Sequence, residues 1–297
     1  MRAKEGCLLF RHCAVAGAGT MGTGIAITIA RAGIATTLFD LDAAALDRAR
    51  AQIADFLAGS VRKGRLTEAQ GAQALDAIRF STDLADLADC DVVVEAVFED
   101  LGVKQSLWQR LDDVCGAQTI FLSNTSTLSI TELAAASRRP ERVAGAHYCL
   151  PAQVMKLVEC SRAIQTSDET WQRTLAFVAA TGQQAIETRD RPGFILNYFC
   201  IPYHNDVIHL IEADVAEPAD IDRAVKAAMG FAMGPCELLD MIGLDTQVRL
   251  SEAMHAVTND PRAAAPPLLR RMVAAGLLGR KSGRGFYAYD TSALYGA

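Results

Sequence analysis

Up to about residue 188 the sequence alternates short β-branched runs with helical patterns, and this alternation restricts the fold more than any other feature. Such alternation is typical of βαβ units around a parallel sheet. The predicted strands are CAVAG (13–17), ATTLFD (35–40), DVVVEA (91–96), TIFLSN (119–124), RVAGAHY (142–148), KLVEC (156–160) and QQAIET (183–188). We therefore predict an α/β fold, a doubly wound parallel sheet of the Rossmann type.

The strand pattern stops at RPGFILNY, and residues 193–278 are helical in pattern, broken at MGFAMGPCE and DPRAAAPP. The domain boundary therefore falls near 189–192, which predicts a nucleotide-binding domain over 1–190 and an all-helical C-terminal domain over 191–297. Inside the first domain, residues 43–78 predict a pair of helices joined at RKGRLT, with Thr67 as the cap of the second helix.

The string VAGAGTMGTGIA follows the first strand and opens a helix, with Gly17, Gly19 and Gly22 in GxGxxG spacing. Alone, this spacing is also compatible with a tight turn before a helix of small residues. In the βα context the glycines can form the turn, admit a pyrophosphate close to the backbone and let the helix approach the sheet, while the helix N-terminus receives the phosphate charge. The predicted cofactor-binding residues here are Gly17, Gly19, Thr20, Met21 and Gly22.

Asp40 closes the second predicted strand, about twenty residues after the glycines. A carboxylate at this place can accept hydrogen bonds from both adenosine ribose hydroxyls and repels a 2'-phosphate. No Arg or Lys follows at once in FDLDAAALDR, so NAD is the predicted cofactor rather than NADP. The alternative is that Asp40 caps the helix beginning near Asp42.

His147 ends a predicted strand, at the edge of the sheet where doubly wound folds bind their ligands. A nicotinamide enzyme needs a base for the alcohol proton, and an imidazole suits that role. Glu159 ends a neighbouring strand pattern and can orient the ring through one nitrogen. The alternative is a buried His–Glu pair with a structural role. The other histidines, expected to be packed or surface residues, are His12, His204, His209 and His255.

Composition narrows the class of partner. The chain has a net charge of −6 and no run of Lys or Arg, which argues against nucleic acid or an anionic membrane and favours a small-molecule partner. No apolar run has the length of a membrane span, and the N-terminus lacks a signal-peptide pattern, so a cytoplasmic location is expected. The eight cysteines show no metal-ligand spacing and are expected to be reduced, mostly buried thiols.

Several stretches together resemble the 3-hydroxyacyl-CoA dehydrogenases, including the bacterial 3-hydroxybutyryl-CoA dehydrogenases. They occur in the family's order and span nearly the whole chain: VAGAGTMGTGIA, VVVEAVFEDLGVK, SNTSTLSI, AHYCLPAQVMKLVE, RPGFILN, MGFAMGPCELLD with IGLD, and LGRKSGRGFYAY. The resemblance implies an enzyme that uses NAD, acts on an acyl-CoA and dimerises through its C-terminal region.

The resemblance also implies roles for individual residues. His147 is then the general base and Glu159 its orienting partner. Ser126 and Asn197 hydrogen-bond the reacting oxygen or hold the substrate, although without the family Ser126 would pass for a helix cap and Asn197 for a polar residue in an apolar helix. The implied residues of the cofactor site are Glu99 and Lys104, and those of the CoA end are Ser60 and Lys63, where KGR is equally compatible with a solvated turn.

The chain departs from the family at two motifs. Where the family usually reads His-Phe-Phe-Asn-Pro, this chain reads His147, Tyr148, Cys149, Leu150, Pro151, and Tyr198 replaces a charged residue after FILN. Loss of the Asn can leave a polar neighbour without a partner, at a cost of roughly 1–3 kcal/mol. The reaction expected first is therefore the interconversion of a short 3-hydroxyacyl-CoA and its 3-oxoacyl-CoA. The alternatives are a free hydroxy acid or carrier-bound intermediate as substrate, and a nucleotide-binding protein that has lost catalysis.

Overall fold

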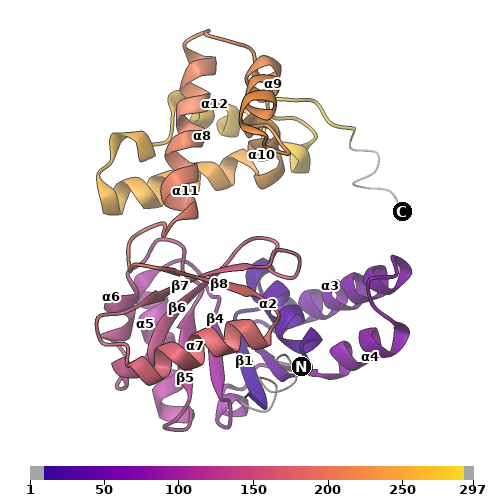
Figure 1. The fold of residues 1–297 in the computed structure, drawn as a ribbon, viewed down its shortest axis with the longest axis vertical. Helices are drawn as coiled ribbons and strands as arrows, with labels where there is room; N and C mark the ends of the chain where they lie inside the picture. Colours follow the sequence, from indigo (N-terminus) through magenta and orange to yellow (C-terminus); the bar gives the residue numbers. More distant parts are fainter. Residues whose placement is uncertain (1–9, 291–297) are drawn as a thin grey trace. The chain divides into compact units, whose positions relative to one another are not determined.

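The computed structural model describes residues 10–290 and divides into two compact units, one of the described residues up to Phe194 and one from Ile195 onward. Figure 1 shows strands only in the first unit and helices through the second. The mixed α/β unit followed by a helical unit is the architecture that the sequence predicts.

An eight-stranded sheet forms the centre of the first unit, in the order β3-β2-β1-β4-β5-β6-β7-β8. The order reverses on either side of β1, which makes the sheet doubly wound around the β1–β4 pair. The strands are β1 (His12–Ala16), β2 (Ala35–Phe39), β3 (Ile78–Ser81), β4 (Val92–Glu95), β5 (Ile120–Ser123), β6 (Val143–Tyr148), β7 (Leu157–Arg162) and β8 (Gln184–Thr188).

The sheet is mostly parallel, as predicted, but its last two strands reverse. Pairing is parallel from β3 through β6, antiparallel between β6 and β7, and parallel again between β7 and β8. β7 follows β6 through a loop of eight residues, too short for the helical crossover that a parallel connection requires. The two strands therefore form a long-looped hairpin at the ligand-binding edge of the sheet.

β3 is a strand that the sequence analysis missed. It has four residues and begins at Ile78, the residue at which the predicted helix pair was expected to end. Only Ala77 separates β3 from the preceding helix. The burial of its four residues alternates only partly, so in the sequence its apolar residues read as a continuation of the helical pattern. Within residues 10–290 β3 is an edge strand, with β2 as its single neighbour.

Helices cover both faces of the sheet because residues in each strand point alternately to opposite faces. In β1, Cys13 and Val15 pack into one apolar core with α2 (Thr20–Arg31), α3 (Ala43–Arg62), α4 (Glu68–Asp76) and α7 (Asp168–Ala180). Ala14 and Ala16 pack into the other core with α5 (Leu101–Val114), α6 (Ile130–Ala134) and the 3₁₀ turn η1 (Leu84–Leu87); a second 3₁₀ turn, η2 (Pro140–Arg142), leads into β6. Both cores consist of buried apolar side chains, and their packing fixes the strand ends that carry the candidate site.

The helix pair α3–α4 extends beside the sheet, as Figure 1 shows. Thr67 caps α4 as predicted: its hydroxyl accepts from Gln70 N at 3.2 Å, and the Gln70 side chain accepts from Thr67 N at 2.9 Å. This reciprocal arrangement satisfies two backbone donors at the helix start.

The C-terminal unit consists of helices and short turns. They are α8 (Leu196–Glu212), α9 (Pro218–Met229), α10 (Pro235–Ile242), α11 (Leu244–Thr258), η3 (Pro261–Ala263), α12 (Pro267–Ala274) and η4 (Arg280–Ser282). Asp240 holds the segment after η4 by accepting from Phe286 N at 3.0 Å and Tyr287 N at 2.9 Å. Three small apolar clusters fill the spaces between the helices.

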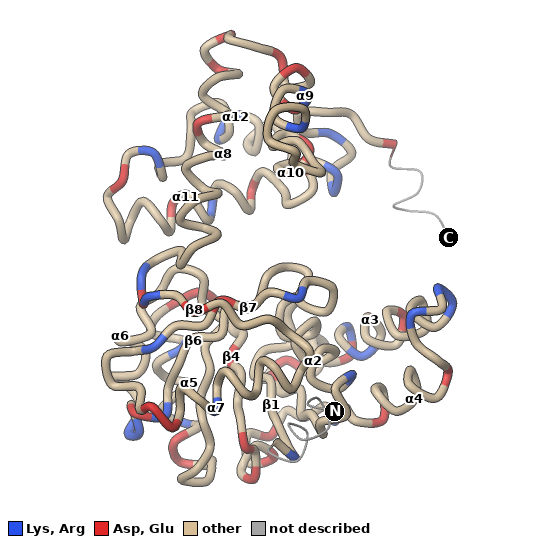
Figure 2. Tube along the Cα trace, in the orientation of Figure 1, with Lys and Arg blue, Asp and Glu red and all other residues tan. Residues whose placement is uncertain are grey.

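Figure 2 shows charges of both signs interspersed along both units. Among residues 10–290, the helices are too short or too polar to cross a bilayer. The seven cysteines of this range form no disulfide with one another, and five of them are buried; Cys7 lies outside the described residues. This agrees with the expectation of reduced, mostly buried thiols.

Candidate active site

The glycine-rich turn between β1 and α2 has three glycines with three different surroundings. Gly17 has a φ of +112°, and a Cβ there would lie 2.5 Å from Ala96 O. A Cβ on Gly22 would collide with Gly17 O. Gly19 has nothing within 4 Å of its Cβ position, so the turn is open at this residue. The first and third glycines are therefore required for packing, and the second leaves room for a ligand.

The N-terminus of α2 faces this opening without a side-chain cap within the described chain. The first amides of a helix have no partner inside the helix, and they attract negative charge. The open turn and the uncapped helix start thus fit a pyrophosphate, which is the fit expected for a dinucleotide.

Asp40 lies next to the turn and is held by it. Its Oδ2 accepts from Ala18 N at 2.7 Å, and its Oδ1 accepts from Asp42 N at 2.9 Å. Asp42, not Asp40, caps α3 by accepting from Ala44 N at 2.9 Å. The carboxylate retains acceptor positions, so Asp40 can still receive ribose hydroxyls.

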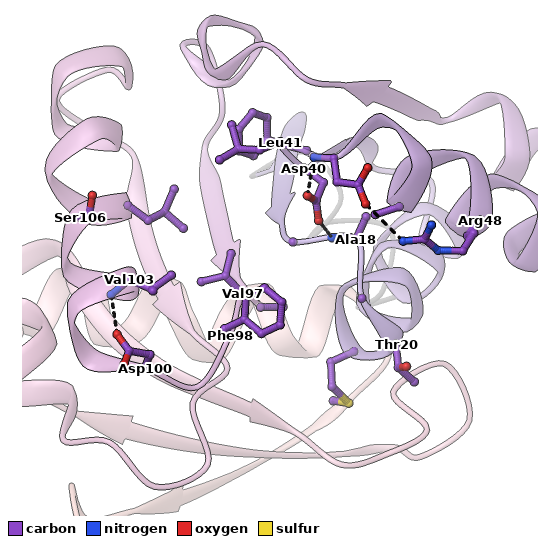
Figure 3. Close-up of a pocket in the computed structure, with 18 of the residues that line it drawn as sticks. Ala18, Thr20, Asp40, Leu41, Arg48, Val97, Phe98, Asp100, Val103 and Ser106 are labelled. Atoms are coloured by element: carbon purple, nitrogen blue, oxygen red, sulfur yellow. Dashed lines mark hydrogen bonds and ion pairs between the residues drawn. The ribbon is translucent and has the colours of Figure 1, made fainter. Parts of the chain in front are cut away.

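A cavity of about 1170 Å³ runs along this edge of the sheet. Of the predicted cofactor residues, Gly17, Gly19, Thr20, Met21 and Asp40 line it, and Gly22, Glu99 and Lys104 do not. Figure 3 shows Asp40 hydrogen-bonded to the turn at Ala18, with Phe98, Val97 and Val103 across the cavity. Val97, Phe98 and Val103 give this wall an apolar surface that suits a planar ring, and the same wall also carries the polar side chains of Asp100, Ser106 and Arg110.

Arg48 also lines the cavity, which the sequence analysis did not foresee because it searched only the residues directly after Asp40. One turn and a half into α3, its guanidinium pairs with Asp42 at 3.3 Å. The dashed line that ends at Arg48 in Figure 3 marks this pair. Because both partners are more than half exposed, the pair is weak.

His147, Glu159 and Ser126 form a hydrogen-bonded line at the carboxyl end of β6. His147 Nδ1 lies 2.9 Å from Glu159 Oε2, and His147 Nε2 lies 3.1 Å from Ser126 Oγ. The His147 side chain is 10% exposed and that of Glu159 is 1% exposed. With Nδ1 donating to the carboxylate, Nε2 is left as the acceptor on the accessible side.

The sheet itself aligns this pair. His147 and Glu159 are direct partners in the antiparallel β6–β7 register, so their side chains stand side by side on one face. The sequence pattern predicts Glu159 at the end of its strand, whereas it is the third residue of β7. It reaches the same edge as His147 because β7 runs in the opposite direction.

The loop that carries Ser126 is shaped by Glu99. Glu99 Oε1 accepts from Thr125 Oγ1 at 2.6 Å, Ser126 N at 2.7 Å and Thr127 N at 3.0 Å. Its Oε2 lies 3.2 Å from Lys104 Nζ. Burial raises the pKa of Glu99, but Lys104 and these hydrogen bonds outweigh burial, so the pKa lies below its ordinary value.

Lys104 is buried beneath the cavity wall. Its Nζ lies 2.6 Å from Glu95 Oε1 and 3.3 Å from Val97 O. Glu95 is fully buried, and its Oε2 accepts from Ser123 Oγ at 2.6 Å. Burial raises the pKa of Glu95, while the Lys104 ammonium acts in the opposite direction. Lys104 thus joins two carboxylates that support the cavity wall and the Ser126 loop.

The structure separates Ser60 and Lys63 from the cavity lining. Ser60 is buried in α3, and its hydroxyl donates to Phe56 O at 2.8 Å. Lys63 is exposed at the end of the same helix. Neither placement tests a CoA contact, so their part in binding stays a proposal.

The remaining sequence-predicted residues lie elsewhere. Asn197 is partly exposed in the first turn of α8, in the C-terminal unit. His12 contacts Thr37 Oγ1 at 2.9 Å, and His204 is buried, with burial lowering its pKa to about 4. His209 and His255 are exposed. These placements leave His147 as the histidine at the ligand-binding edge among the described residues.

Comparison with known sequences decides the family. Residues 12–191 match the profile of the 3-hydroxyacyl-CoA dehydrogenase NAD binding domain, and residues 193–289 match that of the 3-hydroxyacyl-CoA dehydrogenase C-terminal domain. The chain belongs to the 3-hydroxyacyl-CoA dehydrogenase family. It is an NAD-dependent enzyme, as the motif and Asp40 predict.

Relatives resemble this dehydrogenase over almost its full length. A probable 3-hydroxybutyryl-CoA dehydrogenase of Bacillus subtilis is 41% identical over 93% of this chain and 96% of its own. The crystal structure of FadB2 from M. tuberculosis has a TM-score of 0.91 and 40% identity, covering 95% of this chain and 99% of FadB2. That of (S)-3-hydroxybutyryl-CoA dehydrogenase PaaH1 from Ralstonia eutropha has a TM-score of 0.88 and 39% identity, covering 95% and 99%.

Two further residues that shape this dehydrogenase's site were missed in the sequence. Glu95 ends an apolar strand at the ligand-binding edge, a position where a carboxylate is conspicuous. Asn124 follows β5, and its Oδ1 accepts from Tyr148 N at 2.9 Å, which ties the ends of β5 and β6 together. The signal in the sequence is a polar residue directly at the end of an apolar strand. Neither residue belongs to a charged cluster, so this signal is weak for both.

Proposed function

We propose that the enzyme interconverts a short-chain 3-hydroxyacyl-CoA and its 3-oxoacyl-CoA, with His147 as the general base. The observation that carries this proposal is the line Ser126–His147–Glu159, with separations of 3.1 and 2.9 Å, beside a dinucleotide cavity. Alcohol oxidation needs an imidazole that is oriented through one nitrogen and can take up a proton at the other. In His147 these are Nδ1, which lies against Glu159, and Nε2, which lies against Ser126.

In the proposed mechanism, the glycine turn at Gly17 and Gly19 together with Asp40 would hold NAD, which would supply the acceptor for the hydride that leaves C3 of the substrate. His147 Nε2 takes the proton of the 3-hydroxyl group, and Ser126 Oγ hydrogen-bonds the same oxygen. Glu159 accepts from Nδ1, which fixes the tautomer and stabilises the imidazolium that forms. Because Glu159 is almost fully buried, little water competes for this hydrogen bond. In the reverse direction His147 returns the proton to the ketone oxygen. Asn197 is proposed as a second contact to substrate.

The acyl-CoA substrate class is supported by the relatives that align over nearly the whole chain, which are named as 3-hydroxybutyryl-CoA dehydrogenases. We propose the thioester rather than the free acid on this ground, with Ser60 and Lys63 on α3 toward the CoA end. Reduced cysteines are typical of cytoplasmic proteins, and a cytoplasmic location is part of the proposal.

An assay of NADH oxidation tests the function, with acetoacetyl-CoA compared to free acetoacetate at equal concentration. We expect kcat/KM for acetoacetyl-CoA within the usual enzyme range of about 10⁴–10⁸ M⁻¹s⁻¹ and a far lower value for acetoacetate. A preference for the free acid contradicts the thioester assignment. Absence of turnover with both, while NADH still binds, favours a protein that has lost catalysis.

The carboxylate of Asp40 leads us to expect a preference of the enzyme for NADH over NADPH. A carboxylate facing a 2'-phosphate should favour NADH over NADPH by at least tenfold in kcat/KM, or about 1.4 kcal/mol. In Asp40→Ala the preference should fall, because the repulsion is lost and Arg48 is within the same cavity. Steady-state kinetics with both cofactors measures this. Equal use of both by the wild-type enzyme contradicts the assignment of Asp40.

The next prediction concerns Leu150 and the range of substrates that the enzyme accepts. Its side chain is 54% exposed and stands where the family usually has Asn. We expect Leu150→Asn to leave acetoacetyl-CoA turnover equal or higher, because the amide restores a polar contact without disturbing a packed core. Measurement of kcat/KM in both proteins checks this. A poor wild-type value that Asn strongly rescues would show instead that Leu150 shapes a pocket for another substrate.

We also propose a homodimer, formed through the C-terminal unit. Several large apolar side chains of that unit are exposed, among them Phe199, Leu210, Val215, Met229 and Met241. Light scattering at micromolar concentration should give twice the mass of the chain. A monomer mass excludes the dimer.

A further inference from the structure

Residues 189–194, which we call the strap, leave β8 and run past the Ser126 loop to the end of the first unit. Gly193 N donates to Ser126 O at 3.0 Å. The Phe194 ring lies 5.4 Å from the His147 ring, tilted by 38°. The strap therefore contacts two members of the proposed catalytic line, one through its backbone and one through an aromatic face.

Asp190 fastens this strap. Its Oδ2 accepts from Ser129 Oγ at 2.9 Å and from Thr131 N at 2.8 Å, and its Oδ1 accepts from Ile130 N at 2.8 Å. The three hydrogen bonds that this carboxylate accepts join the strap to the start of α6, three residues after Ser126. The strap has no β-ladder to fix it, so this anchor and the Gly193 bond define its path.

The backbone at the end of the strap is held in an unfavourable conformation. Gly193 and Phe194 have φ values of +80° and +48°, and for Phe194 this left-handed region is disfavoured. Phe194 is 5% exposed and packs in the same core as Ile130 and Val143. Such a conformation persists only where neighbouring contacts enforce it. Here the enforcing contacts are the hydrogen bonds of Asp190 and Gly193 and the packing of Phe194.

We propose that Asp190 is a positioning residue for the reaction: it holds the strap so that Phe194 packs on the His147 ring and Gly193 fixes the Ser126 loop. This rests on the proposed function, because it assigns Asp190 through His147 and Ser126. Asp190 touches none of the reacting atoms in the proposed mechanism. Without its anchor, the Ser126 hydroxyl and the imidazole lose their mutual alignment, and misplacement of catalytic groups by about 1 Å can cost on the order of 100-fold in rate.

A first test needs no substrate. The aromatic ring current of Phe194 shifts the ring-proton resonances of His147, and the difference between wild type and Phe194→Leu measures this shift. In Asp190→Ala, the His147 resonances should move at least half of the way to their Phe194→Leu positions. The control is Asp91→Ala: Asp91 accepts from Arg11 N at 2.7 Å and His12 N at 3.1 Å, at the opposite edge of the sheet. Unchanged His147 resonances in Asp190→Ala overturn the proposal.

The second test is a double-mutant cycle with Ser126. Asp190→Ala should lower kcat for acetoacetyl-CoA by on the order of 10- to 100-fold, with KM and NADH affinity within about twofold of wild type. In a Ser126→Ala background the same change should lower kcat by a clearly smaller factor, because only the position of the His147 ring is then left for Asp190 to protect. A residue that only stabilises the fold gives the same factor in both backgrounds, as Asp91→Ala should.

The outcomes separate the two proposals. Absence of wild-type turnover defeats the proposed function, and the His147 resonances still decide whether Asp190 positions the ring. Equal losses in both backgrounds, or no loss at all, overturn the positioning role while the function stands. Asp190→Asn keeps one acceptor oxygen and replaces Asp190→Ala in the test if the latter does not fold. The His147 resonances of Asp190→Asn should lie between those of wild type and Phe194→Leu. If they equal those of wild type, the proposal is overturned.

Discussion

Replacing His147 by Ala should lower kcat by on the order of 10²- to 10⁴-fold, the range for a lost general base. NADH affinity should stay close to that of the wild type, because the ring lies at the end of β6 and outside the lining of the dinucleotide cavity. Stopped-flow kinetics with acetoacetyl-CoA and a fluorescence titration with NADH give the two quantities. Loss of NADH binding would identify His147 as a structural residue.

Glu159→Gln is the graded control for this prediction. The amide can still accept from Nδ1 and orient the ring, but it cannot stabilise the positive charge that the proposed mechanism places on His147. Its kcat should therefore lie between those of wild type and His147→Ala. Full activity of Glu159→Gln would remove the carboxylate from the mechanism.

Lys104→Met should lower the free energy of unfolding by about 3–5 kcal/mol, the cost of removing one partner of a buried ion pair. Lys104 and Glu95 have side chains that are 1% and 0% exposed, so Glu95 is left in the core without a cation. Chemical denaturation at pH 7 measures the loss. The deficit should shrink as the pH falls toward about 4, because a buried carboxyl takes up a proton more readily than an unfolded one.

The double variant Lys104→Met/Glu95→Gln serves as the matched comparison. It removes both charges and keeps both side-chain volumes, so most of the lost stability should return. Its kcat should remain lower than that of wild type, because Glu99 also loses its contact with Lys104, 3.2 Å away. A single variant as stable as wild type would show that water reaches Glu95.

The sequence predicted the sheet well where strands are long apolar runs, and failed where other forces decide. β3 has four residues of mixed polarity, and it forms because β2 offers an open edge, which is a tertiary effect. The reversal of β7 also escaped the prediction, since β7 and β8 are as β-branched as parallel strands. Loop length between β6 and β7 was the available signal.

The candidate site was predictable to the extent that it lies at strand ends. His147 and Asp40 were found because both close strands, and the doubly wound topology brings such ends together. Lys104 was expected at the cofactor, and the structure buries it, because α5 turns this side chain inward onto Glu95. The strap was invisible because the left-handed backbone of Phe194 follows from contacts that no local propensity encodes.

The antiparallel register of β6 and β7 has a consequence for how this enzyme can change over generations. His147 and Glu159 are aligned by a ladder of backbone hydrogen bonds, so their alignment does not depend on the eight residues that connect the strands. Mutations in this connection can accumulate without disturbing the hydrogen-bonded pair of His147 and Glu159. The connection is where Leu150 departs from the family. Selection for a new substrate can therefore change the connection between β6 and β7 while the alignment of His147 and Glu159 is retained.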